Sequence, residues 1–276
     1  MKKVLVIVVT FNGMKWLDRC LGSVRSSETP ADLYVVDNAS ADGSADFVER
    51  EYPEAVLVRN SENLGFTQAN NVGFRYALES GYDFAYLLNQ DAWIFPSTLG
   101  DLLKASDDKT VILSPEQKAA DGVSYDKLFE KNVLSKITST DGSVPRVMAA
   151  HWLVNLGILR KIGLFNPLFP IYGQDDNLCD RARYMGYKVR VVQGVSAIHD
   201  RLYREEPLER IVYRNYFTSS LVRLADPSRS YFLEILRVIP FTIVKAIKYK
   251  SFLPFRYLPK IFSSLSEVKF SRKNFS

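Results

Sequence analysis

Polar side chains interrupt the apolar runs of this 276-residue chain at four places, each at the end of a predicted strand. The clearest case is LLNQDAWI, in which two amides and a carboxylate at 89–91 follow a buried run. The other three groups are Thr10–Asn12, Asp37–Asn38 and Asn60. In a parallel sheet the carboxyl ends of the strands meet at one edge, where ligands bind. Four polar strand ends therefore predict a ligand crevice at that edge.

The elements that must position these groups alternate along the first hundred residues. KVLVIVV, DLYVVD, AVLVRN and YDFAYLLN are apolar, β-branched strand patterns, and a helical pattern follows each of them. This alternation predicts an α/β fold with a mostly parallel sheet flanked by helices. From about 110 to 200 it loosens: TVILSP, VPRVMAAHWLVNLGIL and KVRVVQG are predicted strands, and DNLCDRARYMGY is a predicted helix.

Composition is that of a globular protein, with 47% hydrophobic and 24% charged residues. Cys20 and Cys179 lie far apart, which favours reduced thiols over a disulfide framework. The N-terminal apolar run breaks at Thr10 without a cleavage site, and no stretch reaches membrane-spanning length, so a cytoplasmic protein is expected. The formal charge of +5 is concentrated from Arg237 onward, where Glu267 is the only acid.

Six motifs in order resemble the family 2 glycosyltransferases of the GT-A (Rossmann-like) fold, in their bacterial rhamnosyltransferase-like and galactosyltransferase-like branch. They are VVTFN at 8–12, VDNASADGS at 36–44, NLGFTQANNVG at 63–73, NQD at 89–91, YGQDDNLCDR at 172–181 and AIHD at 197–200. The resemblance covers roughly residues 1–220. It implies an inverting enzyme that moves a sugar from a nucleotide diphosphate sugar to an acceptor hydroxyl.

The resemblance also implies where the donor binds. Residues at the strand ends and at the start of the third helix match donor-binding positions of the family: Thr10, Phe11, Asn12, Asp37, Asn63, Gly65, Asn71 and Asn89. Asp91 matches the last acid of a D-x-D-like triplet, which binds the Mg²⁺ or Mn²⁺ ion that holds the diphosphate. His199 matches a histidine that completes the metal or diphosphate site in several members.

Catalysis is assigned by the resemblance to YGQDDN. Asp175 matches the general base that takes the proton from the acceptor hydroxyl, and Asp176 is the alternative. Gln174 and Asn177 stand where the family has acids, so both remove negative charge near Asp175. One of the two aspartates is also expected to cap the following helix.

Three regions are predicted. Residues 1–110 form the nucleotide-sugar-binding half, and 111–225 form the acceptor and catalytic half. The resemblance implies that the segment with His151 and Trp152 faces the acceptor. Residues 226–276 form a basic, amphipathic helical tail. Its apolar residues follow helical spacing and its lysines fall among them, which predicts a helix that lies on an anionic membrane surface. The alternative is a face that packs on the catalytic domain or on a second subunit.

The predicted function is therefore sugar transfer to a glycan or lipid-linked glycan in surface polysaccharide synthesis, peripheral on the inner face of the plasma membrane. The alternative is a nucleotide-sugar-binding relative with little or no turnover, which only Gln174 and Asn177 support. A dinucleotide-binding oxidoreductase is excluded because no G-x-G-x-x-G follows the first strand, and the P-loop pattern is also absent. No nucleic acid partner is expected.

Overall fold

The computed structural model describes residues 2–137, 139–201 and 207–274. Strands in these ranges form one sheet in the order β3-β2-β1-β4-β7-β6-β8-β5. Their bounds are β1 Val4–Thr10, β2 Asp32–Asp37, β3 Val56–Arg59, β4 Phe84–Asn89, β5 Ala92–Ile94, β6 Thr110–Lys118, β7 His151–Asn155 and β8 Lys188–His199. The four strands β3, β2, β1 and β4 run parallel, β7 is antiparallel to both neighbours, and β5 is antiparallel to β8. The predicted α/β fold is confirmed.

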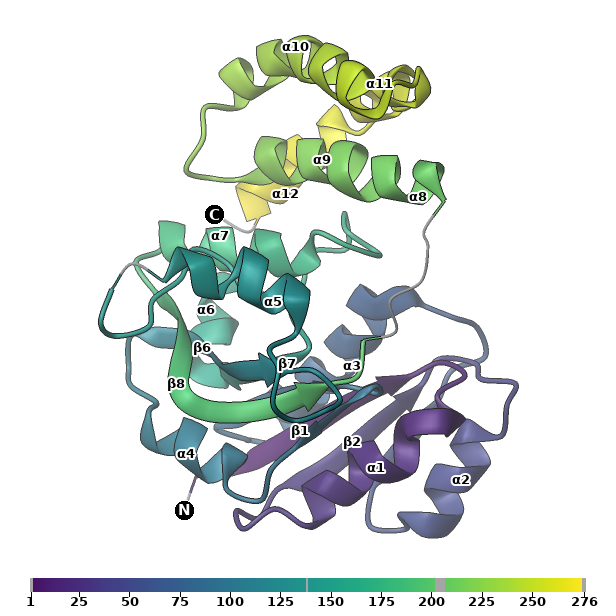
Figure 1. Ribbon diagram of the computed structural model, residues 1–276, viewed down its shortest axis with the longest axis vertical. Coiled ribbons are helices and arrows are strands. Elements are labelled where there is room, and N and C mark those ends of the chain that lie inside the picture. Colours follow the sequence, from purple (N-terminus) through teal and green to yellow (C-terminus); the bar gives the residue numbers. More distant parts are fainter. Residues whose placement is uncertain (1, 138, 202–206, 275–276) are drawn as a thin grey trace.

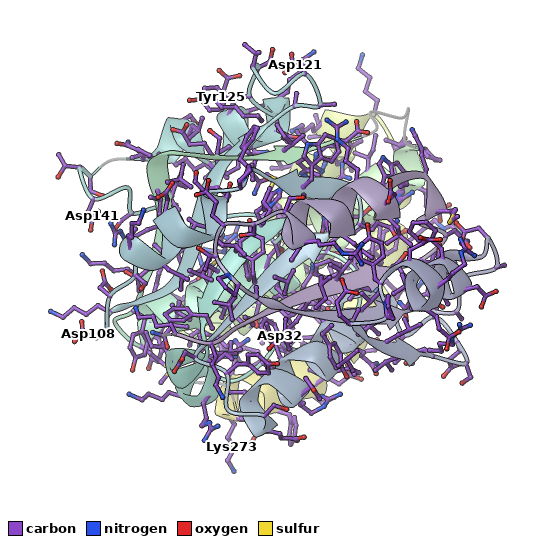
Figure 2. The ribbon with its side chains drawn as sticks, turned by 90° about the horizontal axis from the view of Figure 1, so that it is seen from below. Asp32, Asp108, Asp121, Tyr125, Asp141 and Lys273 are labelled. Atoms are coloured by element: carbon purple, nitrogen blue, oxygen red, sulfur yellow. The ribbon has the colours of Figure 1, made fainter. Side chains whose placement is uncertain are left out.

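Helices cover both faces of this sheet (Figure 1). They are α1 Met14–Arg25, α2 Ser44–Glu51, α3 Gly65–Glu79, α4 Thr98–Lys104, α5 Lys127–Asn132, α6 Leu156–Ile162 and α7 Gln174–Tyr184, with a 3₁₀ turn η1 at Leu134–Lys136. Along β1 the side chains alternate: Leu5 and Ile7 belong to the apolar cluster that includes α3, and Val6 and Val8 to the cluster that includes α1. Burial on both faces explains the uninterrupted apolar run. Exposed acids such as Asp108 lie at the periphery (Figure 2).

One predicted strand is wrong in its second part. The run VPRVMAAHWLVNLGIL contains β7, but the chain turns into α6 directly after Asn155. The Asn155 side chain accepts a hydrogen bond of 3.1 Å from the backbone N–H of Ile158 and so caps the new helix. A short apolar run does not distinguish a buried strand from a buried helix. Here the capping hydrogen bond of Asn155 marks the point where the strand ends and the helix begins.

The C-terminal helices form a stack that lies over α7 and α5 (Figure 1). It comprises α8 Leu208–Val212, a π-helical stretch η2 Tyr213–Thr218, α9 Ser219–Ala225, α10 Tyr231–Tyr249, α11 Leu253–Ser263 and α12 Leu265–Asn274. We call Leu208–Asn274 the helical unit. The expected boundary at 226 falls between α9 and α10, yet both helices contribute to one apolar cluster, which also contains Phe169. Among the described residues, no helix combines the length and hydropathy that a membrane span requires.

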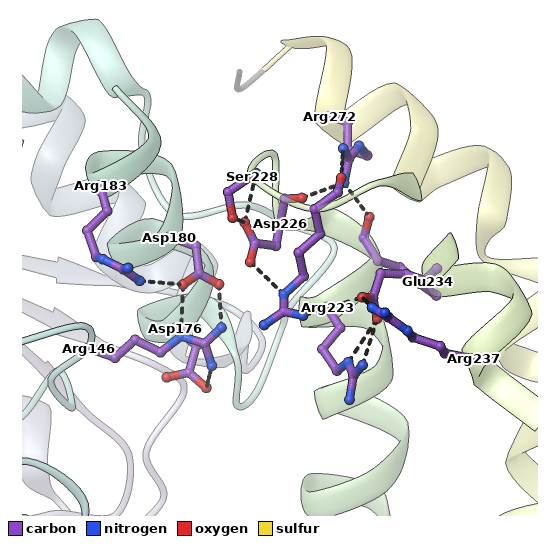
Figure 3. Close-up of polar contacts among 12 residues, drawn as sticks. Arg146, Asp176, Asp180, Arg183, Arg223, Asp226, Ser228, Glu234, Arg237 and Arg272 are labelled. Atoms are coloured by element: carbon purple, nitrogen blue, oxygen red, sulfur yellow. Dashed lines mark hydrogen bonds and ion pairs between the residues drawn. The ribbon is translucent and has the colours of Figure 1, made fainter. Parts of the chain in front are cut away.

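A buried carboxylate fixes α10 against α9 (Figure 3). Glu234 accepts hydrogen bonds from Arg223 at 2.9 Å, from Arg237 at 2.6 Å and from Arg229 at 3.3 Å. Arg272 of α12 donates to the backbone oxygen of Arg229 at 2.7 Å, which ties the last helix to the same corner. The tail predicted from its charge is therefore a packed part of the protein.

Replacing Glu234 by glutamine should lower the free energy of unfolding by about 1.5–3 kcal/mol, because charge-assisted hydrogen bonds to three arginines are lost. Denaturant titration followed by circular dichroism measures the loss. Glu267→Gln, at an exposed position of α12, is the matched control and should change the free energy by less than about 0.5 kcal/mol. Equal unfolding midpoints for the two variants would contradict the role given to Glu234.

Candidate active site

The polar ends of β1, β2 and β4 lie side by side, as the sequence predicts. The backbone N–H of Asn38 donates to the oxygen of Thr10 at 2.8 Å. Gln90, the middle residue of the NQD triplet, accepts hydrogen bonds of 2.9 Å from both the Thr10 hydroxyl and the Phe11 N–H. Gln90 therefore has a structural role, because its hydrogen bonds connect the end of β4 to the end of β1.

Asp37 is the polar group at this edge whose bonding is incomplete. Its side chain is 3% exposed, and one carboxylate oxygen accepts a hydrogen bond of 3.0 Å from the Ser40 N–H. The other oxygen, Oδ1, has no partner among the described residues. Leaving a buried acceptor unpaired costs about 1–3 kcal/mol, so Oδ1 is suited to a hydroxyl or N–H of a ligand. Phe11, 45% exposed, and Asn12, also exposed, lie on the neighbouring loop.

Three other predicted donor residues hold α3 in place. Asn63 accepts a hydrogen bond of 2.9 Å from the Gly65 N–H. Gly65 has φ +75°, and a Cβ there would lie 3.2 Å from the backbone oxygen of Pro170. The Asn71 amide exchanges two hydrogen bonds, of 2.8 and 3.1 Å, with the backbone of Phe165. These contacts give each of the three residues a structural role that does not require a bound ligand.

The fold brings Asp91 and His199 together, although they are far apart in the chain. The pairing of β5 with β8 leaves Asp91 Oδ1 3.6 Å from His199 Nε2. Arg201 lies 3.4 Å from the other ring nitrogen of His199 and pairs with the buried Asp126 at 3.0 Å. Burial alone would raise the pKa of Asp91, but the hydrogen bond and charge of His199, with the charge of Arg201, lower it.

This pair fits a divalent cation. The Asp91 side chain is 27% exposed, so its carboxylate is accessible to an ion. A carboxylate together with an imidazole is a set of ligands that Mn²⁺ accepts. Among the described residues, no cluster of three His, Cys, Asp or Glu side chains could hold an ion. Asp91 and His199 would therefore be the two side chains that hold such an ion.

A cavity of about 560 Å³ opens at the start of α7, with α5 and the η2–α9 segment as its other walls. Tyr172 and Gly173 both have left-handed backbone, with φ +68° and +83°, and this turn directs residues 174–176 to the cavity wall. A Cβ at position 173 would lie 2.7 Å from Thr218 Cγ2, so only glycine allows the turn to contact the helical unit so closely. Strained backbone of this kind is concentrated at functional sites.

Basic residues outnumber acids in this lining: Lys131, Lys136, Arg146, Arg201 and Arg214, against Asp175 and Asp176. Arg146 forms a bidentate pair with Asp180 at 2.8 and 2.5 Å and lies 3.3 Å from Asp176 (Figure 3). Neither Arg146 nor Arg201 was predicted as a site residue from the sequence. No local pattern marks them, because only the tertiary fold brings them to the cavity.

Asp175 differs from its acidic neighbours. Asp176 and Asp180 pair with Arg146, whereas no described basic side chain forms an ion pair with Asp175. Asp175 is half-buried, and desolvation together with the like charge of Asp176 raises its pKa to about 7. A carboxylate that titrates near neutrality is matched to accepting a proton in a reaction.

His151 and Trp152 are both buried, so the expectation that they face an acceptor is wrong. The His151 ring is fully buried, with its two nitrogens 2.9 Å from the Tyr86 hydroxyl and from the Ile198 oxygen. Burial, with the nearby charge of His199, lowers its pKa to about 3, so this imidazole is neutral. Trp152 is buried in the apolar cluster under α3.

The chain belongs to glycosyl transferase family 2, whose family model matches residues 5–162. An undecaprenyl-phosphate mannosyltransferase of Micrococcus luteus is 30% identical over 150 residues, which are 53% of this chain and 60% of that protein. The low-salt glycan biosynthesis hexosyltransferase Agl10 of Haloferax volcanii is 24% identical over 208 residues, covering 69% of this chain and 67% of that protein. The mannosyltransferase PcManGT from Pyrobaculum calidifontis, solved with GDP-Man and Mn²⁺, has a TM-score of 0.63 at 18% identity, covering 98% of this chain and 75% of that one. This last likeness shows the GT-A fold.

The Asp175 carboxyl group should titrate with a midpoint near pH 7 in the folded protein, well above an ordinary aspartate. Asp176→Asn removes the neighbouring negative charge and should move the midpoint to lower pH. Carboxyl ¹³C NMR measures both midpoints, with the exposed Asp108→Asn as the matched control. A midpoint that Asp176→Asn leaves unchanged would show that the like charge does not contribute.

Proposed function

We propose that the protein is an inverting, metal-dependent glycosyltransferase that moves a sugar from a nucleotide diphosphate sugar to a hydroxyl of a glycan or lipid-linked glycan. The observation that carries this proposal is the cavity at the start of α7, where Asp175 has no ion-pair partner among the described residues and a pKa near neutrality. All lining residues fall within the predicted acceptor half, 111–225, and the polar strand ends fall within the donor half, 1–110. Synthesis of a surface polysaccharide is the proposed setting.

Donor binding is proposed at the strand ends. Asp37 Oδ1 would accept a hydrogen bond from the nucleobase or ribose, and Phe11 and Asn12 would line the base. Thr10 and Asn89 lie at the ends of β1 and β4, beside these groups. The GDP-Man bound by the structural relative PcManGT supports a nucleotide sugar as the ligand.

Asp91 and His199 would hold Mg²⁺ or Mn²⁺ beside the donor diphosphate. Such an ion stabilises the negative charge that develops on the departing diphosphate. Arg201, in contact with His199, adds a fixed positive charge at the same place. The Mn²⁺ in PcManGT supports this assignment.

Asp175 is proposed as the base that takes the proton of the acceptor hydroxyl. Asp176, the alternative, is already paired with Arg146 at 3.3 Å, whereas no described basic side chain forms an ion pair with Asp175. Gln174 and Asn177 are the support for the second candidate function, a relative that binds nucleotide sugars with little turnover. The ionisable Asp175 in an open cavity favours the enzyme.

The helical unit supports a location at the inner face of the plasma membrane. One face of α10 consists of large apolar side chains, all exposed: Phe232, Leu233, Leu236, Ile239, Ile243, Val244 and Ile247. The opposite face packs on the rest of the helical unit through Val238 and Thr242. Lys245, Lys248 and Lys250 lie on the same helix or directly after it and complement an anionic lipid surface, each worth about 1 kcal/mol there. A second copy docked on this face would bring like charges together.

Asp175→Asn should reduce transfer on the order of 10²–10⁴-fold and leave donor affinity unchanged, because the base contacts the acceptor and not the donor. Steady-state transfer and calorimetric donor binding measure the two effects. Asp176→Asn, the matched control, should keep most of the activity. Near-normal turnover by Asp175→Asn would move the base role to Asp176.

Asp91→Ala should weaken donor binding only when Mg²⁺ or Mn²⁺ is present, because the carboxylate acts through the cation. Thermal shifts with nucleotide sugars, with and without chelator, measure this effect. If chelation leaves the affinity of the wild type unchanged, the metal role is wrong. Basic side chains such as Arg201 and Arg214 would then balance the diphosphate.

The wild type should float with anionic vesicles and be released at high salt. A triple variant with Ile239→Ser, Ile243→Ser and Ile247→Ser should not float, because it lacks three exposed apolar side chains of α10. None of the three belongs to the buried core, so the fold should be unchanged. Val123→Ser, at an exposed apolar position between β6 and α5, is the control and should float normally. A wild type that ignores anionic vesicles would contradict the membrane location.

A further inference from the structure

Gln174, the first residue of α7, is a buried polar side chain in the cavity wall whose bonding is incomplete. It is 7% exposed and lines the cavity, and its Oε1 has no hydrogen-bond partner among the described residues. Buried acceptors without partners are rare and costly in folded proteins. Neither the resemblance nor the sequence gives Gln174 a role beyond the loss of an acidic residue.

The backbone before Gln174 forms a tight turn that packs against the helical unit. Tyr172 and Gly173 both have left-handed backbone, and a Cβ on Gly173 would lie 2.7 Å from Thr218, 2.8 Å from Val222 and 3.1 Å from Phe169. Such a turn costs folding free energy and persists only where surrounding packing enforces it. The same turn brings both Gln174 and Asp175 to the cavity wall.

The chemistry of the orphan atom defines its ligand. An amide oxygen accepts hydrogen bonds from O–H or N–H groups and carries no charge. A glutamate at this position would add a third negative charge beside Asp175 and Asp176, whereas the amide keeps the acceptor oxygen without that repulsion. A neutral acceptor next to a base is suited to a second hydroxyl of the molecule whose first hydroxyl gives up its proton.

We propose that Gln174 is a specificity-determining residue that binds a hydroxyl of the acceptor sugar next to the hydroxyl that reacts at Asp175. This inference rests on the proposed function and narrows it. The acceptor is a sugar with two neighbouring free hydroxyls, not a lipid phosphate without a sugar. Proton transfer to Asp175 is unchanged, since Gln174 only holds the acceptor.

The test compares Gln174→Met with wild type on alkyl glycosides and on the matching monodeoxy glycosides. Methionine has a similar length and removes the amide. Gln174→Met should raise KM for the full acceptor by roughly 10- to 100-fold, as expected for a lost hydrogen bond that leaves a buried group unpaired, and leave the donor KM unchanged. For the wild type, the deoxy acceptor should raise KM by a similar factor. For Gln174→Met, the deoxy acceptor should give the same KM as the full acceptor. Such non-additive effects indicate a direct contact between the side chain and the missing hydroxyl.

Gln117→Met is the matched control. Gln117 is fully buried and both of its amide atoms lack partners among the described residues, but it does not line the cavity. It should leave every KM unchanged. An equal acceptor KM for wild type and Gln174→Met, or additive losses with the deoxy acceptor, would overturn the inference. Donor hydrolysis without acceptor separates this failure from failure of the proposed function, because hydrolysis depends on the donor site and not on Gln174.

Discussion

The left-handed turn at Tyr172–Gly173 is the constraint on which the arrangement of the site depends. Because position 173 has no Cβ, the turn can contact Thr218 of the helical unit and still begin α7. The residues just before it contact α3: the hydroxyl of Thr67 donates to the oxygen of Phe169, and the oxygen of Pro170 lies against Gly65. Helix α3, helix α7 and the helical unit therefore meet at one short loop.

Two buried carboxylates of this protein are paired with arginines, whereas no described basic side chain forms an ion pair with the proposed base, Asp175. Glu234 and Asp180 are buried and each contacts at least one arginine. At Asp180 burial raises the pKa and Arg146 opposes this rise, whereas at Glu234 the arginines outweigh burial and lower the pKa. Asp175 lies near Asp180 on the same helix but has no such partner among the described residues. Its proton affinity is consequently set by desolvation and by Asp176, which is the condition that acid–base chemistry at neutral pH requires.

Local periodicity was enough to predict the central part of the fold. The apolar runs of β1, β2 and β4 and the polar groups that follow them indicated the sheet and the edge at which these groups gather, since strand direction brings the strand ends together. Periodicity failed at Leu156–Ile162, where an apolar run after a capping asparagine continues as helix. It also did not show that α10 packs on α9, because the two carry separate amphipathic patterns and share a core only in three dimensions.

Site residues divide in the same way. Asp37, Asp91 and Asp175 were predicted from motifs, and the structure gives each a distinct environment: an oxygen without a partner among the described residues, a contact with His199 and a raised pKa. Arg146 and Arg201 reach the cavity from segments without a local signal, so only the folded chain reveals them.

Inversion at the anomeric carbon is the central claim, because a single base at Asp175 implies one displacement. ¹H NMR of the sugar first released from a nucleotide sugar, or first transferred from it, measures this directly through the coupling of the anomeric proton. The proposed mechanism predicts a product whose anomeric configuration is opposite to that of the donor. A product that retains the donor configuration would contradict it.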